Sequence, residues 1–183
     1  MATSPASGPG SASVLEPIPD ALALGLLGAT APLAAIAAAA DAFPSGEMRL
    51  GAVVLAAGAS VAKVGFIHDG SAAGLTLAKA GIYDASFNLV ASTASFHGTI
   101  NGQAGGYHEF ALSAAYVVPA FAFYYLGALF VGVTPPALSE VFGSNSNANV
   151  AGIYASWRQT GLADLPNPAV RAAGNLAYFY TAA

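Results

Sequence analysis

The feature that most constrains this chain is a run of twenty-four residues, 111–134, without a single charged side chain. About 20 apolar residues in a helix are enough to cross the hydrocarbon core of a bilayer. The run is rich in aromatic residues, carries Pro119 inside it and stops at Pro135 and Pro136, where a helix cannot continue. It therefore predicts a transmembrane helix with a kink at Pro119.

Two further apolar runs precede this one. Residues 21–40 carry no charge and lie between Asp20 and Asp41, and residues 50–67 carry only Lys63. A short polar turn containing a proline and a glycine separates the two runs, which predicts an antiparallel helical hairpin. The lysine lies near the far end of its run, where its ammonium group can reach the membrane interface by snorkelling.

Charge is scarce along the whole chain. Five basic and nine acidic residues make up 8% of the 183 residues, against about 25% in ordinary soluble domains. A dispersed soluble domain needs a charged surface, so much of this surface is expected to face lipid or other subunits. A net charge of −4 without any basic cluster excludes a nucleic-acid-binding protein. The absence of cysteine excludes disulfides and thiolate metal sites.

Together these patterns predict an all-α integral membrane protein with about three transmembrane helices, a Gly-rich connecting segment and a non-spanning C-terminal tail. The scattered Lys and Arg residues leave the orientation in the membrane open. The predicted parts are a flexible N-terminal tail at 1–20, a membrane domain at 21–134 with spans at about 21–40, 50–67 and 111–134, and a C-terminal peripheral extension at 135–183.

Histidine is the residue type most able to carry chemistry here, because the chain has only three and no catalytic motif. There is no nucleophile elbow, no phosphate-binding loop and no histidine pair at zinc-site spacing, so no catalytic and no metal site is predicted. A single neutral imidazole can ligate one metal centre, such as that of a porphyrin-type ring. The predicted cofactor-binding residues are His108, His68, His97 and Glu109; the alternative is that each histidine is hydrogen-bonded to a loop at the interface.

The stretch Gly105-Gly106-Tyr107-His108-Glu109-Phe110, leading into the aromatic run, resembles the entry into a late span of photosystem I reaction-centre subunit XI. The resemblance covers residues 21–134 and is mainly topological. It implies a non-catalytic thylakoid membrane subunit that binds chlorophyll and carotenoid and mediates contacts between complexes. The chain departs from the family in its first run, which has no histidine to ligate a pigment.

The function expected from these patterns is a non-catalytic membrane subunit of an energy-converting complex, above all a photosystem I subunit in photosynthesis. Its partners would be other membrane subunits, lipids and pigments. Two alternatives remain open. One is an Ala/Gly-rich structural protein of a shell or capsid. The other is a small membrane channel or carrier, although no span carries the acidic residue that marks an ion path.

Overall fold

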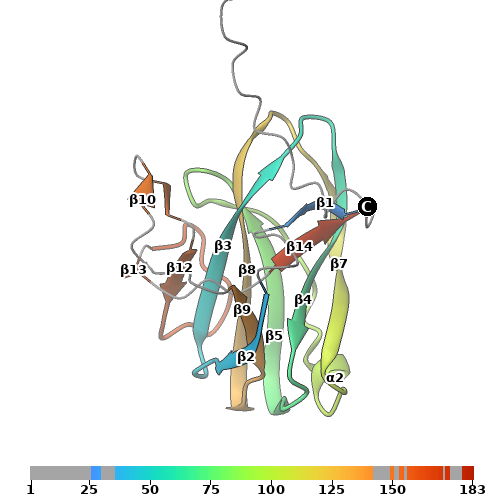
Figure 1. Cartoon of the computed structure of the whole chain (residues 1–183), viewed down its shortest axis with the longest axis vertical. Coiled ribbons are helices and arrows are strands. Elements are labelled where there is room, and N and C mark those ends of the chain that lie inside the picture. Colours follow the sequence, from blue (N-terminus) through green and yellow to red (C-terminus); the bar gives the residue numbers. More distant parts are fainter. Residues whose placement is uncertain are drawn as a thin grey trace, which may run out of the picture.

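The fold is built from β-strands that form two sheets packed face to face (Figure 1). A computed structural model of the protein describes the residues 26–29, 36–141, 149–150, 153–154, 156–170, 172–173 and 179–183.

The first sheet has the strand order β1-β14-β4-β9-β2, with β7 on the opposite edge of β4. Strands β14 and β9 follow one another along the same edge of β4, because both pair with it at successive residues. Its strands are β1 (Leu26–Ala29), β2 (Ile36–Ala42), β4 (Ser60–His68), β7 (Gly106–Val117), β9 (Ala137–Val141) and β14 (Phe179–Ala182).

The second sheet has the order β13-β12-β3-β8-β5-β6. A short hairpin of β10 (Asn149–Val150) and β11 (Ile153–Tyr154) stands apart, and α2 (His97–Ile100) leads into β7. The strands of the second sheet are β3 (Glu47–Leu55), β5 (Ala73–Tyr83), β6 (Leu89–Ser92), β8 (Ala122–Thr134), β12 (Ser156–Gln159) and β13 (Ala172–Ala173).

The strand pairs are nested along the chain. β2 pairs with β9, β3 with β8, β4 with β7 and β5 with β6, all antiparallel. This nesting is the topology of a jelly roll. In this double-sheet architecture, a ribbon of four antiparallel strand pairs is wrapped around one core.

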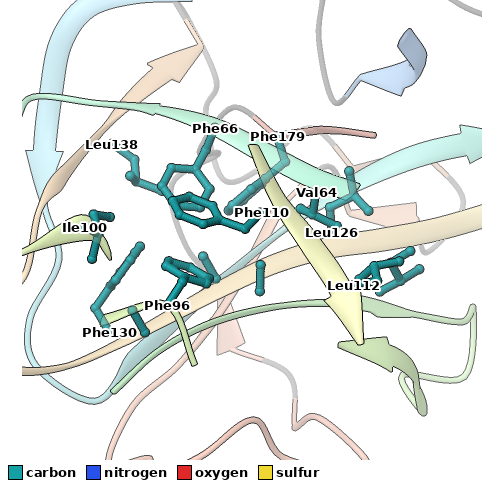
Figure 2. Close-up of a cluster of buried hydrophobic side chains, with 14 of the residues drawn as sticks. Val64, Phe66, Phe96, Ile100, Phe110, Leu112, Leu126, Phe130, Leu138 and Phe179 are labelled. Atoms are coloured by element: carbon teal, nitrogen blue, oxygen red, sulfur yellow. The ribbon is translucent and has the colours of Figure 1, made fainter. Parts of the chain in front are cut away.

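Aromatic side chains fill the space between the sheets (Figure 2). Phe66 of the first sheet stacks on Phe110 with ring centroids 5.3 Å apart, and Phe130 of the second sheet meets Phe66 edge-on at 5.8 Å. Phe96, just before α2, stacks on Phe110 at 3.7 Å. Offset-stacked and edge-on rings add to the stabilisation that burial of their apolar area provides.

The three predicted transmembrane helices are wrong. Residues 111–134 form the second half of β7, a turn and β8, while residues 50–67 form most of β3, a turn and β4. In the described part of 21–40 lie β1 and most of β2. The only helix among the described residues has four residues, and none there is long and apolar enough to cross a bilayer. The fold is therefore β-rich and not all-α, and the predicted integral membrane protein of a thylakoid photosystem I, which rested on transmembrane helices, is wrong as well.

The physical reason for the error is that β8 is buried on both faces. Its inward residues, such as Leu126 and Phe130, lie in the core between the sheets, whereas Leu129 lies in a second apolar cluster on the outer face. The segment 156–170, called the cover segment below, contributes Trp157 and other apolar side chains to this outer cluster. A strand that is buried on both faces reads as a continuous apolar run rather than as an alternating one.

The C-terminal part of the chain contributes strands to both sheets. β9 and β14 pair with β2, β1 and β4, and β12 pairs with β3. The predicted N-terminal tail, residues 1–20, lies outside the described residues.

Candidate functional site

Two of the predicted site residues, His68 and His108, meet at one end of the sandwich, the end near α2 in Figure 1. His68 is the last residue of β4 and His108 lies near the start of β7, two strands that are paired so that Phe66 is opposite His108. Because side chains alternate along a strand, both histidines point to the same face as Phe66 and Phe110, toward the core. Their rings stack with centroids 4.6 Å apart and planes at 29°.

The hydrogen bonds of the pair define where each ring carries its proton. His68 is only 2% exposed, and its Nδ1 accepts a hydrogen bond of 3.0 Å from the backbone N–H of Gly70. A neutral imidazole has one N–H, so Nε2 of His68 must carry it. Nε2 of His108 lies 3.0 Å from the carbonyl oxygen of Ala104, which can only accept, so this nitrogen is protonated as well.

Burial keeps His68 neutral. It lowers the pKa of His68 below the usual 6.5, and the neighbouring ring of His108 lowers the pKa further. The carboxylate of Asp69 and the side chain of Gln103 act in the opposite direction but do not outweigh burial. Nε2 of His68 and Oε1 of Gln103 are both buried without a hydrogen bond of standard geometry, so the amide is a weak partner of the ring.

Three connecting loops meet beside the histidine pair, and Asp69 ties two of them together. Burial raises the pKa of Asp69, but hydrogen bonds from Ser71 and Ala137 lower it more, so the net shift is downward. One carboxylate oxygen accepts from the N–H and the hydroxyl of Ser71, at 2.9 and 2.7 Å, and from the N–H of Ala137 at 3.2 Å. The N–H of Asp69 donates back to the carbonyl oxygen of Ala137.

The third loop is held by close backbone contact at Gly70. This residue has φ of +82°, and a Cβ placed on it would lie 2.5 Å from the backbone nitrogen of Gly105. Glycine is therefore required here both for the left-handed conformation and for the space. The name loop junction is used below for residues 69–71, 103–105 and 137.

The other two predicted residues do not join the pair. Nδ1 of His97, at the start of α2, lies 3.0 Å from the hydroxyl of Ser95. Glu109 follows His108 on β7, so its side chain points to the opposite face. There it accepts hydrogen bonds from Lys63 at 3.0 Å and from the hydroxyl of Tyr107 at 3.2 Å. Lys63, expected to snorkel at a membrane interface, is thus half of a surface ion pair.

The residues around His68 do not fit an axial ligand of chlorophyll. Ligation requires an accessible lone pair on the ring, whereas Nδ1 of His68 is occupied by Gly70 and Nε2 is buried and protonated. Pigment binding stays a prediction from the family resemblance. Within the described ranges, no three His, Cys, Asp or Glu residues are grouped so that they could hold a metal ion.

The sequence did not predict the buried ion pair between Glu47 and Arg49 on β3. Arg49 donates from Nε to Glu47 at 2.7 Å, and both side chains are at most 5% exposed. The guanidinium also lies 4.3 Å from the ring centroid of Phe43. The signal was present, because charged residues two apart on a strand point to the same face. Nothing local indicated that this face would be the inside.

A small groove lies where the edges of the two sheets approach each other. It is lined by residues 90–92 on β6 and by residues 113–116 on β7, and its volume is about 210 Å³. Thr93 and Leu112 form an isolated bridge between these edges. The lining side chains are small, aromatic or hydroxylic, with no charged group among them.

Comparison with known proteins adds no relative: no protein-family model matches this chain, and no curated protein sequence matches it significantly.

Proposed function

We propose that this chain is a non-catalytic structural subunit of a protein shell, such as a capsid, that covers its charge-poor surface with other subunits. The observation that supports this most is the shortage of free charge on the β-sandwich. Charged residues make up 8% of the chain, against about 25% in ordinary soluble domains, and a charge-poor surface favours association.

Most of the charges on the described side chains are already neutralised within the chain. Glu47 and Arg49 are buried together, and Lys63 is paired with Glu109. Lys79 is likewise paired with Asp164. Three described charges have no such ion pair: the carboxylates of Asp69 and Asp84 accept backbone N–H groups of their own turns, and Arg158 is exposed.

Apolar side chains are also exposed on this surface. Single exposed apolar residues are normal on any protein, but here few charges surround them. A surface of this kind favours association over dispersion. Among the described residues, the most exposed large apolar side chains are Val133 at 85%, Val170 at 65%, Val117 at 62% and Phe121 at 51%.

The jelly-roll topology is compatible with this proposal but does not select it. Double-sheet jelly rolls occur in viral capsid proteins, in lectin domains and in cupins. Because one fold serves many functions, the topology is support by analogy only, and the surface carries the argument.

The test is the association state of the full chain. Sedimentation velocity over a wide range of protein concentrations should show reversible assembly into larger species. A variant with lysine at the four exposed apolar positions should dissociate, while a matched variant with threonine there should still assemble. Circular dichroism would check that both variants fold. A wild-type chain that sediments as a monomer at every concentration would overturn the proposal.

A further inference from the structure

The histidine pair stands beside the loop junction, where two connections of the sandwich are joined by hydrogen bonds and a third lies in close backbone contact with them. We propose that His68 is an acid-sensitive latch: protonation of its Nδ1 releases the backbone of Gly70 and loosens the loop junction. This inference goes beyond the shell function and does not depend on it.

The hydrogen bond from Gly70 requires a neutral His68. An imidazolium carries N–H groups on both nitrogens and accepts no hydrogen bond. Adding a proton to Nδ1 therefore replaces a 3.0 Å hydrogen bond by two donors that face each other. The ring cannot turn to water without leaving its place, because it is 2% exposed and stacked on His108.

Among the groups that face the ring, His108 lowers the pKa of His68, whereas Asp69 and Gln103 raise it without outweighing burial. From β7 the facing group is the ring of His108, stacked on His68 with ring centroids 4.6 Å apart. From the loop after β4 the facing group is the carboxylate of Asp69. Its Oδ1 already accepts hydrogen bonds from the N–H groups of Ser71 and Ala137. The loop before β7 offers only the neutral Gln103. The paired residue of β9, Leu138, and Phe66 of β4 itself are apolar.

Loss of the hydrogen bond from Gly70 would affect the packing of all three loops of the loop junction. Gly70 lies against Gly105 of the loop before β7, and its neighbour Asp69 exchanges hydrogen bonds with Ala137 between β8 and β9. The loop from β4 to β5 begins at Asp69 itself. A change at Nδ1 of His68 is thus coupled to three connections by direct bonds and contacts, with no intervening element.

The direction of the pH effect follows from the lowered pKa. Burial, followed by the field of His108, holds the pKa of His68 in the folded chain below 6.5, its ordinary value. Folded chains then bind fewer protons than unfolded ones between the folded-state pKa and 6.5. Stability is unaffected above this window, declines as the pH falls through it, and levels off below it. One proton changes the unfolding equilibrium by at most about tenfold per pH unit.

Nitrogen NMR on the full, uniformly ¹⁵N-labelled chain tests the latch directly. Long-range ¹H–¹⁵N spectra of the imidazoles should show His68 with its proton on Nε2 at neutral pH and a titration midpoint below 6.5. The hydrogen-exchange protection factors of the Gly70 and Ala137 amides should fall with the same midpoint. The amide of Thr93, which donates to Ala80 in the second sheet, serves as the internal control and should keep its protection.

Two variants separate the latch from general acid sensitivity. In His68→Asn the side-chain oxygen can take the place of Nδ1 as acceptor but does not titrate, so protection of Gly70 should become independent of pH. His97→Asn removes a histidine outside the junction and should leave the wild-type response intact. Should His68→Asn fail to fold, the titration of wild-type His68 decides alone. A proton on Nδ1 at neutral pH, or Gly70 protection that does not follow the titration of His68, would overturn the proposal.

Discussion

Strands β7 and β8 are joined by one short turn but lie in opposite sheets with different surroundings. Along β7 buried Phe110 and Leu112 alternate with exposed Tyr107 and Ala111. Along β8 seven consecutive residues, 124–130, are buried. The difference lies in the cover: the cover segment packs on the outer face of the second sheet, where β8 is a central strand, whereas β7 lies at an edge of the first sheet.

This contrast teaches that a long apolar run can result from covering both faces of a sheet. One layer of residues from far along the chain is enough to turn the alternating pattern of a half-exposed strand into a continuous one. If this explanation holds, substitutions on the outer face of the second sheet should be as costly as core substitutions. Equivalent changes on the outer face of β7 should cost little.

The largest contrast is expected between the ion pairs of the two sheets. Glu47→Gln removes the carboxylate of Glu47 from the buried guanidinium of Arg49 and should lower the free energy of unfolding by about 3–5 kcal/mol. Urea unfolding followed by circular dichroism measures this directly. A loss below about 1 kcal/mol would mean that the site is reached by water and that the inner face is less closed than described.

The outer cluster of the second sheet is tested by Leu129→Ala. Leu129 is fully buried under the cover segment, so its truncation should cost about 2–5 kcal/mol, as for a core leucine. Leu126→Ala, on the inner face of the same strand and equally buried, is the matched comparison. The contrast between the sheets breaks down if Leu129→Ala proves nearly neutral while Leu126→Ala is not.

A smaller effect is expected at Gly127, where β8 approaches β3 closely. A Cβ at this position would lie 2.4 Å from Cδ2 of Leu50 and 3.1 Å from the carbonyl oxygen of Arg49. Gly127→Ala should therefore cost about 1–3 kcal/mol through overpacking. Ala111→Ser, at an exposed site of β7, is the control and should stay within about 0.5 kcal/mol of the wild type in thermal unfolding.

The smallest effect concerns the surface pair on the first sheet. The side chains of Lys63 and Glu109 are 44% and 26% exposed, so Glu109→Gln should change the free energy of unfolding by no more than about 1 kcal/mol. Any difference from the wild type should shrink further in high salt, because exposed charges are screened. An effect as large as that of Glu47→Gln would show that the outer face of β7 is more enclosed than the exposure of these two side chains indicates.

Part of the fold could be read from the sequence and part could not. The turn expected around Pro44 and Gly46 is present, with the N–H of Glu47 donating to the carbonyl oxygen of Pro44. Length and lack of charge could not distinguish one 24-residue helix from two strands and a turn, since apolar runs without periodicity are ambiguous. Pro119 lies in the turn between β7 and β8, but in an apolar run of this length a proline is equally compatible with a kinked transmembrane helix.

The candidate site, like the fold, could be predicted only in part from the sequence. The sequence singled out His68, His97, His108 and Glu109. Of these, His68 and His108 are forty positions apart and meet through the register of β4 and β7. Their protonation states depend on Gly70 and Ala104, two backbone groups that no pattern of side chains indicates. The shielding of β8 likewise depends on residues 156–170, which no local window includes.

The position of β14 has a consequence for how the chain is made. This strand lies between β1 and β4, and its Phe179 is fully buried beside Phe66, with ring centroids 6.4 Å apart. During synthesis the first sheet therefore lacks an interior strand until residue 179 and its neighbours have left the ribosome. Until then the aromatic core has an open side, so a nascent chain stalled before this point would depend on chaperones, whatever the stability of the finished sandwich.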